Sequence, residues 1–158
     1  MIRKIEAADW ELLRDVRLRA LTEDPDAFAA THAQESRFSD EQWQGRAAQS
    51  NGASFVVDGA EGPEGLVTGF VDDDPATVFL VGMWLAPALR GTGVAGELVS
   101  HVVEWARTSG AMRVSLSVEG HNQRAARLYE RFGFTETKDP PEFPYKPNEG
   151  NRFFVLEL

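Results

Sequence analysis

The sequence predicts a mixed fold, α/β (α+β), in which a mostly antiparallel central sheet of about seven strands is flanked by about four helices. Segments in which apolar residues alternate or form short unbroken runs indicate strands, and segments with apolar residues three or four apart indicate helices. The two kinds of segment are mixed along the chain. No repeat, low-complexity tract or long linker interrupts the 158 residues, so we expect one domain over residues 1–158.

The first half of the chain is expected to begin with a strand and a helix and to continue with a second helix and two strands. The strands are expected at Ile2–Glu6, Ser54–Val57 and Gly65–Asp72, and the helices at Asp9–Leu21 and from Ser39 through Trp43. Asp9 is the expected N-cap of the first helix. Ser39 and Gln42 have the spacing of a capping box at the second. Pro25 interrupts the segment from Asp24 to Asp40, which we expect to be irregular or partly helical.

The second half alternates strands with two longer helices. The expected order is a buried strand at Thr77–Leu85, a loop at Pro87–Gly93, a helix from Val94 to Gly110, a strand at Arg113–Val118, a helix from Asn122 to Gly133, and strands at Phe134–Thr137 and Phe153–Leu158. Val94, Leu98, Val102 and Ala106 are four residues apart and form an apolar helix face. A proline-rich loop at Lys138–Asn151 separates the last two strands.

Charge and residue usage exclude several classes of protein. Sixteen Lys and Arg against 25 Asp and Glu give a net charge of −9, which disfavours binding to nucleic acid or to an anionic membrane surface. The chain has no cysteine, its histidines (His32, His101 and His121) lack metal-ligand spacing, and no Gly-x-Ser-x-Gly motif occurs, so we expect neither a metal site nor a serine hydrolase. The N-terminus has no apolar signal sequence and no run is long enough to span a membrane, which predicts a cytoplasmic protein.

The segment Arg90-Gly-Thr-Gly-Val-Ala-Gly96 lies between a buried strand and a helix. The first N–H groups of a helix have no partner within it, and the helix dipole favours negative charge, so this loop is a candidate phosphate site. A tight turn without a ligand remains an alternative. The spacing Gly91-x-Gly93-x-x-Gly96, with Glu119 downstream, also matches a dinucleotide-binding fingerprint, although it falls late in the chain. No Gly-Lys-Ser/Thr follows, which excludes a Walker loop.

Two motifs resemble those of the GNAT superfamily of N-acyltransferases. The loop from Leu85 to Ala95 is similar to the acetyl-CoA signature Arg/Gln-x-x-Gly-x-Gly/Ala, with Arg90, Gly93 and Ala95 at its defining positions. Further along, the segment Asn122–Phe134 resembles Asn-x-x-Ala-x-x-Leu-Tyr-x-x-x-Gly-Phe. Either motif alone would be only suggestive, whereas the pair is specific and covers residues 79–134.

This resemblance implies an acetyltransferase that uses acetyl-CoA and moves the acetyl group to a primary amine. Its implied coenzyme-binding residues are Met83, Leu85, Arg90, Gly91, Thr92, Gly93, Val94, Ala95, Gly96 and Asn122. The loop amides would bind the pyrophosphate, and the strand before the loop would splay from its neighbour and pair with the pantetheine arm. Asn122 would contact that arm, and a helix N-cap is an alternative and compatible role. Tyr129 would be the catalytic acid that protonates the leaving thiolate, against the alternative of a core aromatic residue.

The general base is left open by the sequence. Some family members have a glutamate five residues before the asparagine, where this chain has Ser117. The substitutes are Glu35, Glu119 and the run Asp72–Asp74, which is more often a solvated turn. A non-catalytic acyl-CoA-binding or regulatory domain that has lost its base is therefore the main alternative function.

The acceptor is expected to be an amine-bearing small molecule or a protein or peptide. The segment Phe28–Trp43 and the loop carrying Phe143 and Tyr145 are long enough to line its groove, and both could equally fill the core. Arginines at helical spacing, Arg124, Arg127 and Arg131, could contact the 3′-phosphate of the coenzyme or form a solvated stripe. A homodimer is compatible with the sequence, but no feature predicts one.

Overall fold

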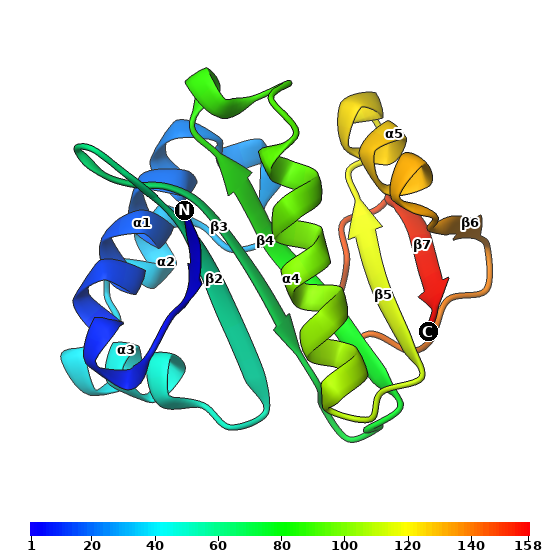
Figure 1. Ribbon diagram of the computed structural model, residues 1–158, viewed down its shortest axis with the longest axis horizontal. Coiled ribbons are helices and arrows are strands. Elements are labelled where there is room, and N and C mark those ends of the chain that lie inside the picture. The colour runs from blue at the N-terminus through cyan, green and yellow to red at the C-terminus, as the bar shows by residue number, and fades with distance from the viewer.

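The computed structural model describes residues 1–158 and is built around a seven-stranded sheet (Figure 1). The strands are β1 (Ile2–Lys4), β2 (Gly52–Gly59), β3 (Gly62–Phe70), β4 (Thr77–Leu85), β5 (Arg113–Val118), β6 (Thr135–Thr137) and β7 (Arg152–Glu157). They lie in the order β1-β2-β3-β4-β5-β7-β6. Only β4 and β5 are parallel, and all other neighbours are antiparallel. The predicted fold class is confirmed.

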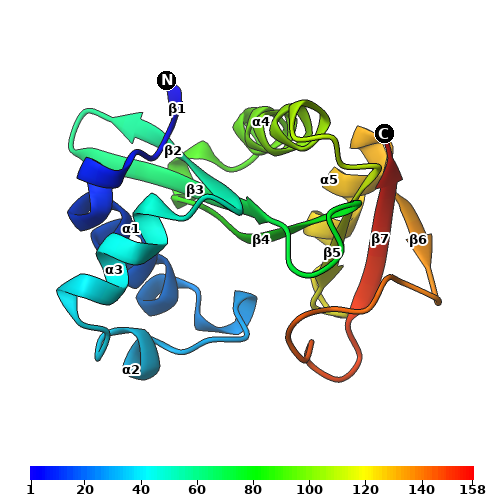
Figure 2. The same ribbon diagram turned by 90° about the horizontal axis from the view of Figure 1, so that it is seen from below.

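Five helices cover the two faces of the sheet. They are α1 (Trp10–Glu23), α2 (His32–Glu35), α3 (Asp40–Ala48), α4 (Val94–Thr108) and α5 (Gln123–Phe132). Figure 2 shows α4 on one face and α1, α2 and α3 on the other, with the loop before β7 projecting to the same side as α1–α3. The face covered by α4 also packs against residues of α5. None of these helices combines the length and the apolar character of a membrane span.

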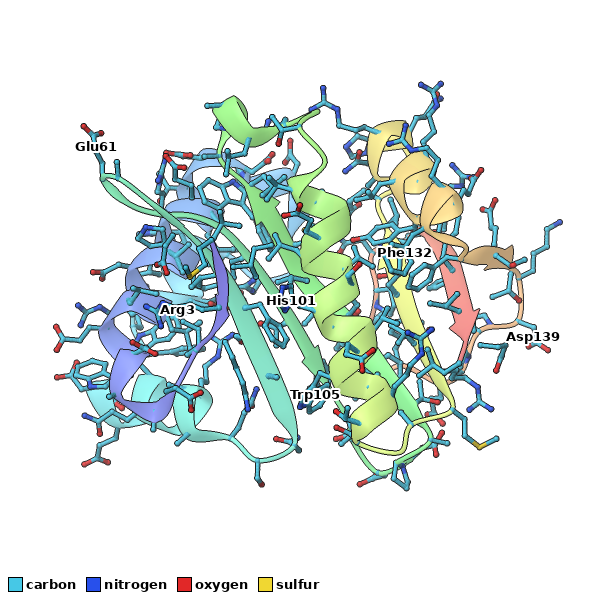
Figure 3. The ribbon with its side chains drawn as sticks, in the orientation of Figure 1. Arg3, Glu61, His101, Trp105, Phe132 and Asp139 are labelled. Carbon is cyan, nitrogen blue, oxygen red and sulfur yellow. The ribbon has the colours of Figure 1, made fainter.

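The helices are held by two apolar cores, one on each face of the sheet. On the α4 face, Leu98, Val102 and Ala106 are fully buried as their spacing predicted, whereas Val94 is only partly buried. His101 and Trp105 lie one turn apart on the same helix (Figure 3), and the ring of His101 is 5.3 Å from that of Phe55. The second core includes Trp43 of α3 and Leu13, Val16 and Ala20 of α1. Burial of each large apolar side chain stabilises the fold by about 1.5–3 kcal/mol.

The helix starts confirm one sequence expectation and correct another. Ser39 and Gln42 form the capping box of α3: the Gln42 amide donates to Ser39 Oγ at 3.2 Å, and the Ser39 amide donates to Gln42 Oε1 at 2.8 Å. The helix continues past Trp43 to Ala48. Asp9 precedes α1, but the prediction that its side chain caps that helix is wrong. Its carboxylate accepts from the Glu6 amide at 2.8 Å and thereby caps the preceding 3₁₀ turn, Ala7–Asp9.

Candidate active site

The parallel strands β4 and β5 separate a short distance along their length. They pair at Thr77–Arg113, Val78–Val114 and Phe79–Ser115 and no further, while β4 remains paired with β3 to its end and β5 with β7. From Leu80 onward, the edge of β4 that faces β5 therefore has no strand partner. Its free N–H and C=O groups can bind an extended ligand as a further strand would. The splay that the resemblance implied is present.

A bulge in β4 lies where the two strands have separated. Leu66 pairs with Trp84 and Thr68 pairs with Val81, so Gly82 and Met83 together lie opposite a single residue of β3. Gly82 adopts φ +65°, a left-handed conformation that favours glycine. A bulge bends a strand and re-aims its groups. The bulge was not predicted from the sequence, although a glycine inside a strand is a signal for one.

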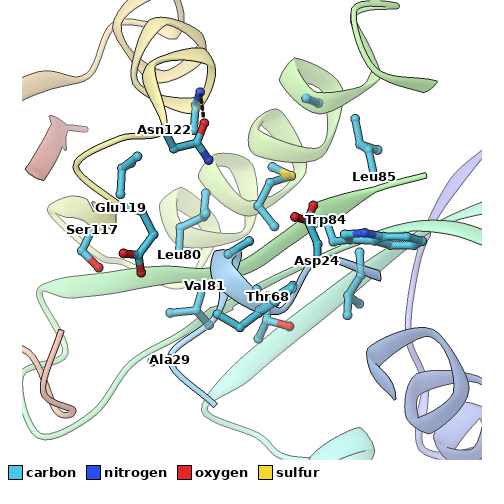
Figure 4. Close-up of a pocket in the computed structure, with 18 of the residues that line it drawn as sticks. Asp24, Ala29, Thr68, Leu80, Val81, Trp84, Leu85, Ser117, Glu119 and Asn122 are labelled. Carbon is cyan, nitrogen blue, oxygen red and sulfur yellow. Dashed lines mark hydrogen bonds between the residues drawn. The ribbon is translucent and has the colours of Figure 1, made fainter. Parts of the chain in front are cut away.

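A cleft of about 1230 Å³ occupies the space between the separated strands. It is lined from the α1–α3 face by Arg17, Phe28 and Glu35, and from the opposite face by Asn122 and Tyr129 of α5. Leu80, Val81 and Leu85 of β4 also line the cleft (Figure 4). Because the lining comes from both faces of the sheet, one molecule can enter from each side and meet at β4.

The glycine loop forms one end of this cleft. Gly93 is the N-cap of α4 with φ +92°, and Gly91 has φ +77°. No atom lies within 4 Å of a Cβ built on either glycine, so no packing within the chain requires them to lack a side chain. Seven of the implied coenzyme residues other than Asn122 line the cleft: Met83, Leu85, Arg90, Gly91, Gly93, Ala95 and Gly96. Thr92 and Val94 do not line it.

Asn122 and Tyr129 reach the cleft from α5. Asn122 Oδ1 accepts from the Ala125 amide at 3.1 Å, so the N-cap role is present, and the residue also lines the cleft (Figure 4). Tyr129 is 4% exposed, and its ring lies 5.6 Å from Phe134 and 6.5 Å from Phe154. Burial raises the pKa of Tyr129 well above its usual value of 10.0, so the phenol stays protonated at neutral pH.

Comparison with known proteins identifies the family. A model of the acetyltransferase (GNAT) family matches residues 11–134, which is more than half of the chain. The chain belongs to the GNAT family. An uncharacterized N-acetyltransferase of Mycobacterium tuberculosis is 38% identical over 74 residues, which cover 45% of this chain and 47% of the relative. This chain thus spans about half the length of the relatives that it matches.

Solved structures show the GNAT fold over the whole chain. An acetyltransferase of the GNAT family from Streptococcus pneumoniae superposes with a TM-score of 0.81 at 20% identity, covering 100% of this chain and 99% of that one. The PaiA N-acetyltransferase of Thermoplasma acidophilum, in complex with coenzyme A, gives a TM-score of 0.75 at 14% identity over 100% and 98% of the two chains. In this fold the glycine loop belongs to a mostly antiparallel sheet, so the alternative of a dinucleotide-binding module is wrong.

Among the carboxylates considered as the base of this GNAT protein, the run Asp72–Asp74 lies outside the cleft. Asp74 accepts from the Ala76 amide at 2.9 Å and from Thr77 Oγ1 at 3.0 Å, at the start of β4. The cleft opens at the other end of that strand. The run lies at the opposite end of β4 from the cleft, so its position does not favour a role as the base.

Glu35 lies in the cleft, but its carboxylate is already hydrogen-bonded to two arginines. It is 4% exposed, and its carboxylate accepts from Arg17 Nε at 2.9 Å, Arg17 Nη2 at 3.1 Å and Arg46 Nη1 at 3.1 Å. Burial raises the pKa of Glu35, but the hydrogen bonds and charges of Arg17 and Arg46 outweigh burial and hold the pKa below its usual value. A carboxylate so strongly held in its ionised form is a poor proton acceptor, so Glu35 is not suited to be the base.

Glu119 remains, and it lies just beyond the end of β5 in the lining of the cleft (Figure 4). Asn148 Nδ2 donates to Glu119 Oε1 at 2.8 Å. In the orientation that satisfies both ends of its amide, Asn151 donates to Glu119 Oε2 at 3.1 Å. These bonds fix the carboxylate. Burial raises the pKa of the nearby Tyr145 phenol, and Ser117 lowers it by a smaller amount.

Both variable segments contribute to the cleft and to packing. Phe28 and the two alanines after it line the cleft from the α1–α3 face, and Tyr145 lines it from the loop before β7. Phe143 of the same loop instead packs against Phe79, with ring centroids 5.1 Å apart, and against Phe153 at 5.5 Å. The loop is therefore anchored to the sheet by one aromatic residue and presents the next one to the cleft.

Proposed function

We propose that the chain transfers an acetyl group from acetyl-CoA to a primary amine by direct attack in a ternary complex. The observation that carries the proposal is the unpaired edge of β4, which runs from Leu80 to Leu85, shortly before the glycine loop at the start of α4. Membership of the GNAT family supports it, as does the coenzyme A complex of the T. acidophilum relative. Bound acetyl-CoA would supply an acyl group activated as a thioester.

The residues present fit this coenzyme. The space beside Gly91 and Gly93 leaves the first amides of α4 open to a phosphate, and the helix dipole favours its charge. The backbone of Met83 and Leu85 would pair with the amides of the pantetheine arm. Asn122 would contact the same arm with its amide nitrogen, because its oxygen is used as the helix cap. Arg124, Arg127 and Arg131 line the same cleft and could meet the 3′-phosphate.

Tyr129 is the proposed general acid. Amine attack forms a C–N bond and breaks the C–S bond; the nitrogen then loses its second proton to solvent, and the leaving thiolate needs a proton. A phenol whose pKa is raised by burial still holds its proton for that transfer at neutral pH. The Tyr129 ring is fixed by Phe134 and Phe154, which would hold the hydroxyl in one position.

Glu119 is the proposed general base. An alkylamine is almost fully protonated at pH 7, so one proton must leave before the nitrogen can attack. Glu119 would bind the ammonium group and accept this proton, directly or through one water. Asn148 and Asn151 would keep its carboxylate directed into the cleft.

Two measurements test this proposal against the alternative of a non-catalytic acyl-CoA-binding domain. Calorimetric titration with acetyl-CoA should show micromolar binding, and titration with NAD should show none. Release of free thiol should then appear when amines are added. Acetyl-CoA binding without thiol release from any amine would favour the binding domain, and absence of acetyl-CoA binding would overturn both functions.

A further inference from the structure

Three charged residues on the α1–α3 side of the cleft have no role in the acetyl transfer described above. Arg17 and Glu35 form two parallel hydrogen bonds, and Arg46 adds a third to the same carboxylate. All three residues line the cleft. We call Arg17, Glu35 and Arg46 the arginine cluster.

The arginine cluster has more positive than negative charge. Two guanidinium groups share one carboxylate, so one positive charge is left without a counter-ion within the cluster. Arg17 donates its Nε and Nη2 hydrogen bonds to Glu35. Its Nη1 points at the bulge in β4 and lies 3.0 Å from the position of a Cβ built on Gly82. A cationic donor with spare N–H groups therefore faces the strand that would bind the acyl group.

Aromatic residues hold both guanidinium groups in place. The Arg17 guanidinium lies 4.8 Å from the ring centre of Phe28, and that of Arg46 lies 4.9 Å from Trp43 and 5.7 Å from Phe38. The Arg17 side chain is only 13% exposed. Groups fixed in this way lose little freedom when a ligand binds, and a planar guanidinium suits a carboxylate.

We propose that the acceptor is an amine that carries its own carboxylate, as an amino acid does, and that the arginine cluster binds this carboxylate. The inference rests on the proposed function, because it assigns the acceptor of the same cleft. Glu119 on the β5 side would bind the ammonium group while Arg17 Nη1 and Arg46 bind the carboxylate. Such a zwitterion has no net charge, so the overall charge of −9 on the chain does not repel it.

The test compares amines that differ only in the carboxylate. Thiol release from acetyl-CoA is measured with each of the twenty L-amino acids and β-alanine, each beside its own amide. We expect at least one amino acid to exceed its amide in kcat/KM by about tenfold to hundredfold, the usual effect of a charge-assisted hydrogen bond. Acetyl-CoA affinity is measured by calorimetry on the same preparations.

Arg46→Met is the informative variant. It removes the unbalanced charge but keeps the Arg17–Glu35 pair, and the flexible apolar side chain of methionine can replace the contact of the guanidinium with Trp43. It should reduce the preference for the amino acid over its amide to about threefold or less, mainly through KM, while acetyl-CoA affinity stays unchanged. The matched control is Arg14→Met on α1, because Arg14 contacts only Trp10 and surface carboxylates and lies outside the cleft. It should behave as the wild type.

Each outcome decides the inference. Amides that react as well as their acids, or an Arg46→Met preference equal to that of the wild type, would overturn the acceptor class and leave the acetyltransferase proposal standing. No thiol release from any carboxylate-bearing amine would also overturn it. Calorimetry then separates the two proposals, because loss of acetyl-CoA binding refutes the proposed function as well.

Discussion

Replacing Gly93 by alanine is expected to weaken acetyl-CoA binding far more than its effect on stability requires. Gly93 has φ +92° at the start of α4, a backbone conformation that costs an L-residue about 1–2 kcal/mol. For a chain of this length, that loss lowers Tm by about 2–8 °C. Relief of the strain would rotate the peptide and turn the first amides of α4 away from the phosphate. Loss of one such charge-assisted bond weakens binding by about 1.5–3 kcal/mol, or about 10- to 150-fold.

Gly110→Ala is the matched control. Gly110 follows the other end of the same helix, has φ +84°, and has no atom within 4 Å of a Cβ built on it, as at Gly93. It does not line the cleft. The two variants should therefore lose similar stability in thermal unfolding, and only Gly93→Ala should lose affinity in calorimetric titration at 20 °C or below.

Two results would refute this reasoning. If Gly93→Ala keeps the wild-type affinity while its Tm falls as in Gly110→Ala, the loop does not bind the pyrophosphate. If both variants lose affinity equally, the loss comes from general destabilisation of α4, which would refute a specific role of the Gly93 conformation in binding.

Three further variants test the other roles. Tyr129→Phe should lower kcat about 100-fold with unchanged acetyl-CoA affinity. Because burial raises the pKa of Tyr129, wild-type kcat should not decline up to about pH 10. A decline below about pH 9 would contradict the acid role. Glu119→Gln should also lower the rate about 100-fold at pH 7, and its remaining rate should rise with pH as free amine accumulates, whereas a wild-type rate would exclude Glu119 as the base. Glu35→Gln should destabilise the fold by about 3–5 kcal/mol in urea unfolding at pH 7, because it leaves two arginines without their carboxylate. The folded state lowers the pKa of Glu35 from 4.5, so the stabilisation by its carboxylate is present above pH 4.5 and is lost as pH falls through the folded pKa. A difference in the free energy of unfolding between wild type and Glu35→Gln that does not shrink below pH 4.5 would contradict this.

Local patterns predicted most of the fold. The bounds of β4 and β5 matched the structure, because an unbroken apolar run and a strict alternation each leave little choice of register. The capping box at Ser39 was equally local and was also confirmed. The predicted side-chain cap at Asp9 was wrong because two helix starts compete for its carboxylate. No pattern in the sequence indicates the 3₁₀ turn that binds this carboxylate. The short helix α2 was expected only as partly helical, since four residues carry little periodic signal.

The candidate site could be predicted where its residues are close in sequence and not where they converge from distant elements. The glycine loop and the Asn122–Tyr129 helix are each continuous segments. The arginine cluster instead joins α1, α2 and α3, and no pattern in the sequence indicates that Glu35 would be held by two arginines. The three candidate bases could be ranked only from the structure, because Asp72–Asp74 lie outside the cleft and Glu35 is held by two arginines within it.

The position of Glu119 gives a physical account of the departure at Ser117. Side chains two residues apart in an extended chain point to the same side, so Ser117 and Glu119 share the face of β5 that borders the cleft. A carboxylate at position 119 lies about 7 Å further along an extended chain than one at position 117 and points to the same side. Ser117 and Tyr145 both line the cleft, and the loop that carries Tyr145 also brings Asn148 within hydrogen-bonding distance of Glu119. The loop and Glu119 thus form one arrangement, in which Asn148 and Asn151 orient the proposed base two residues beyond Ser117.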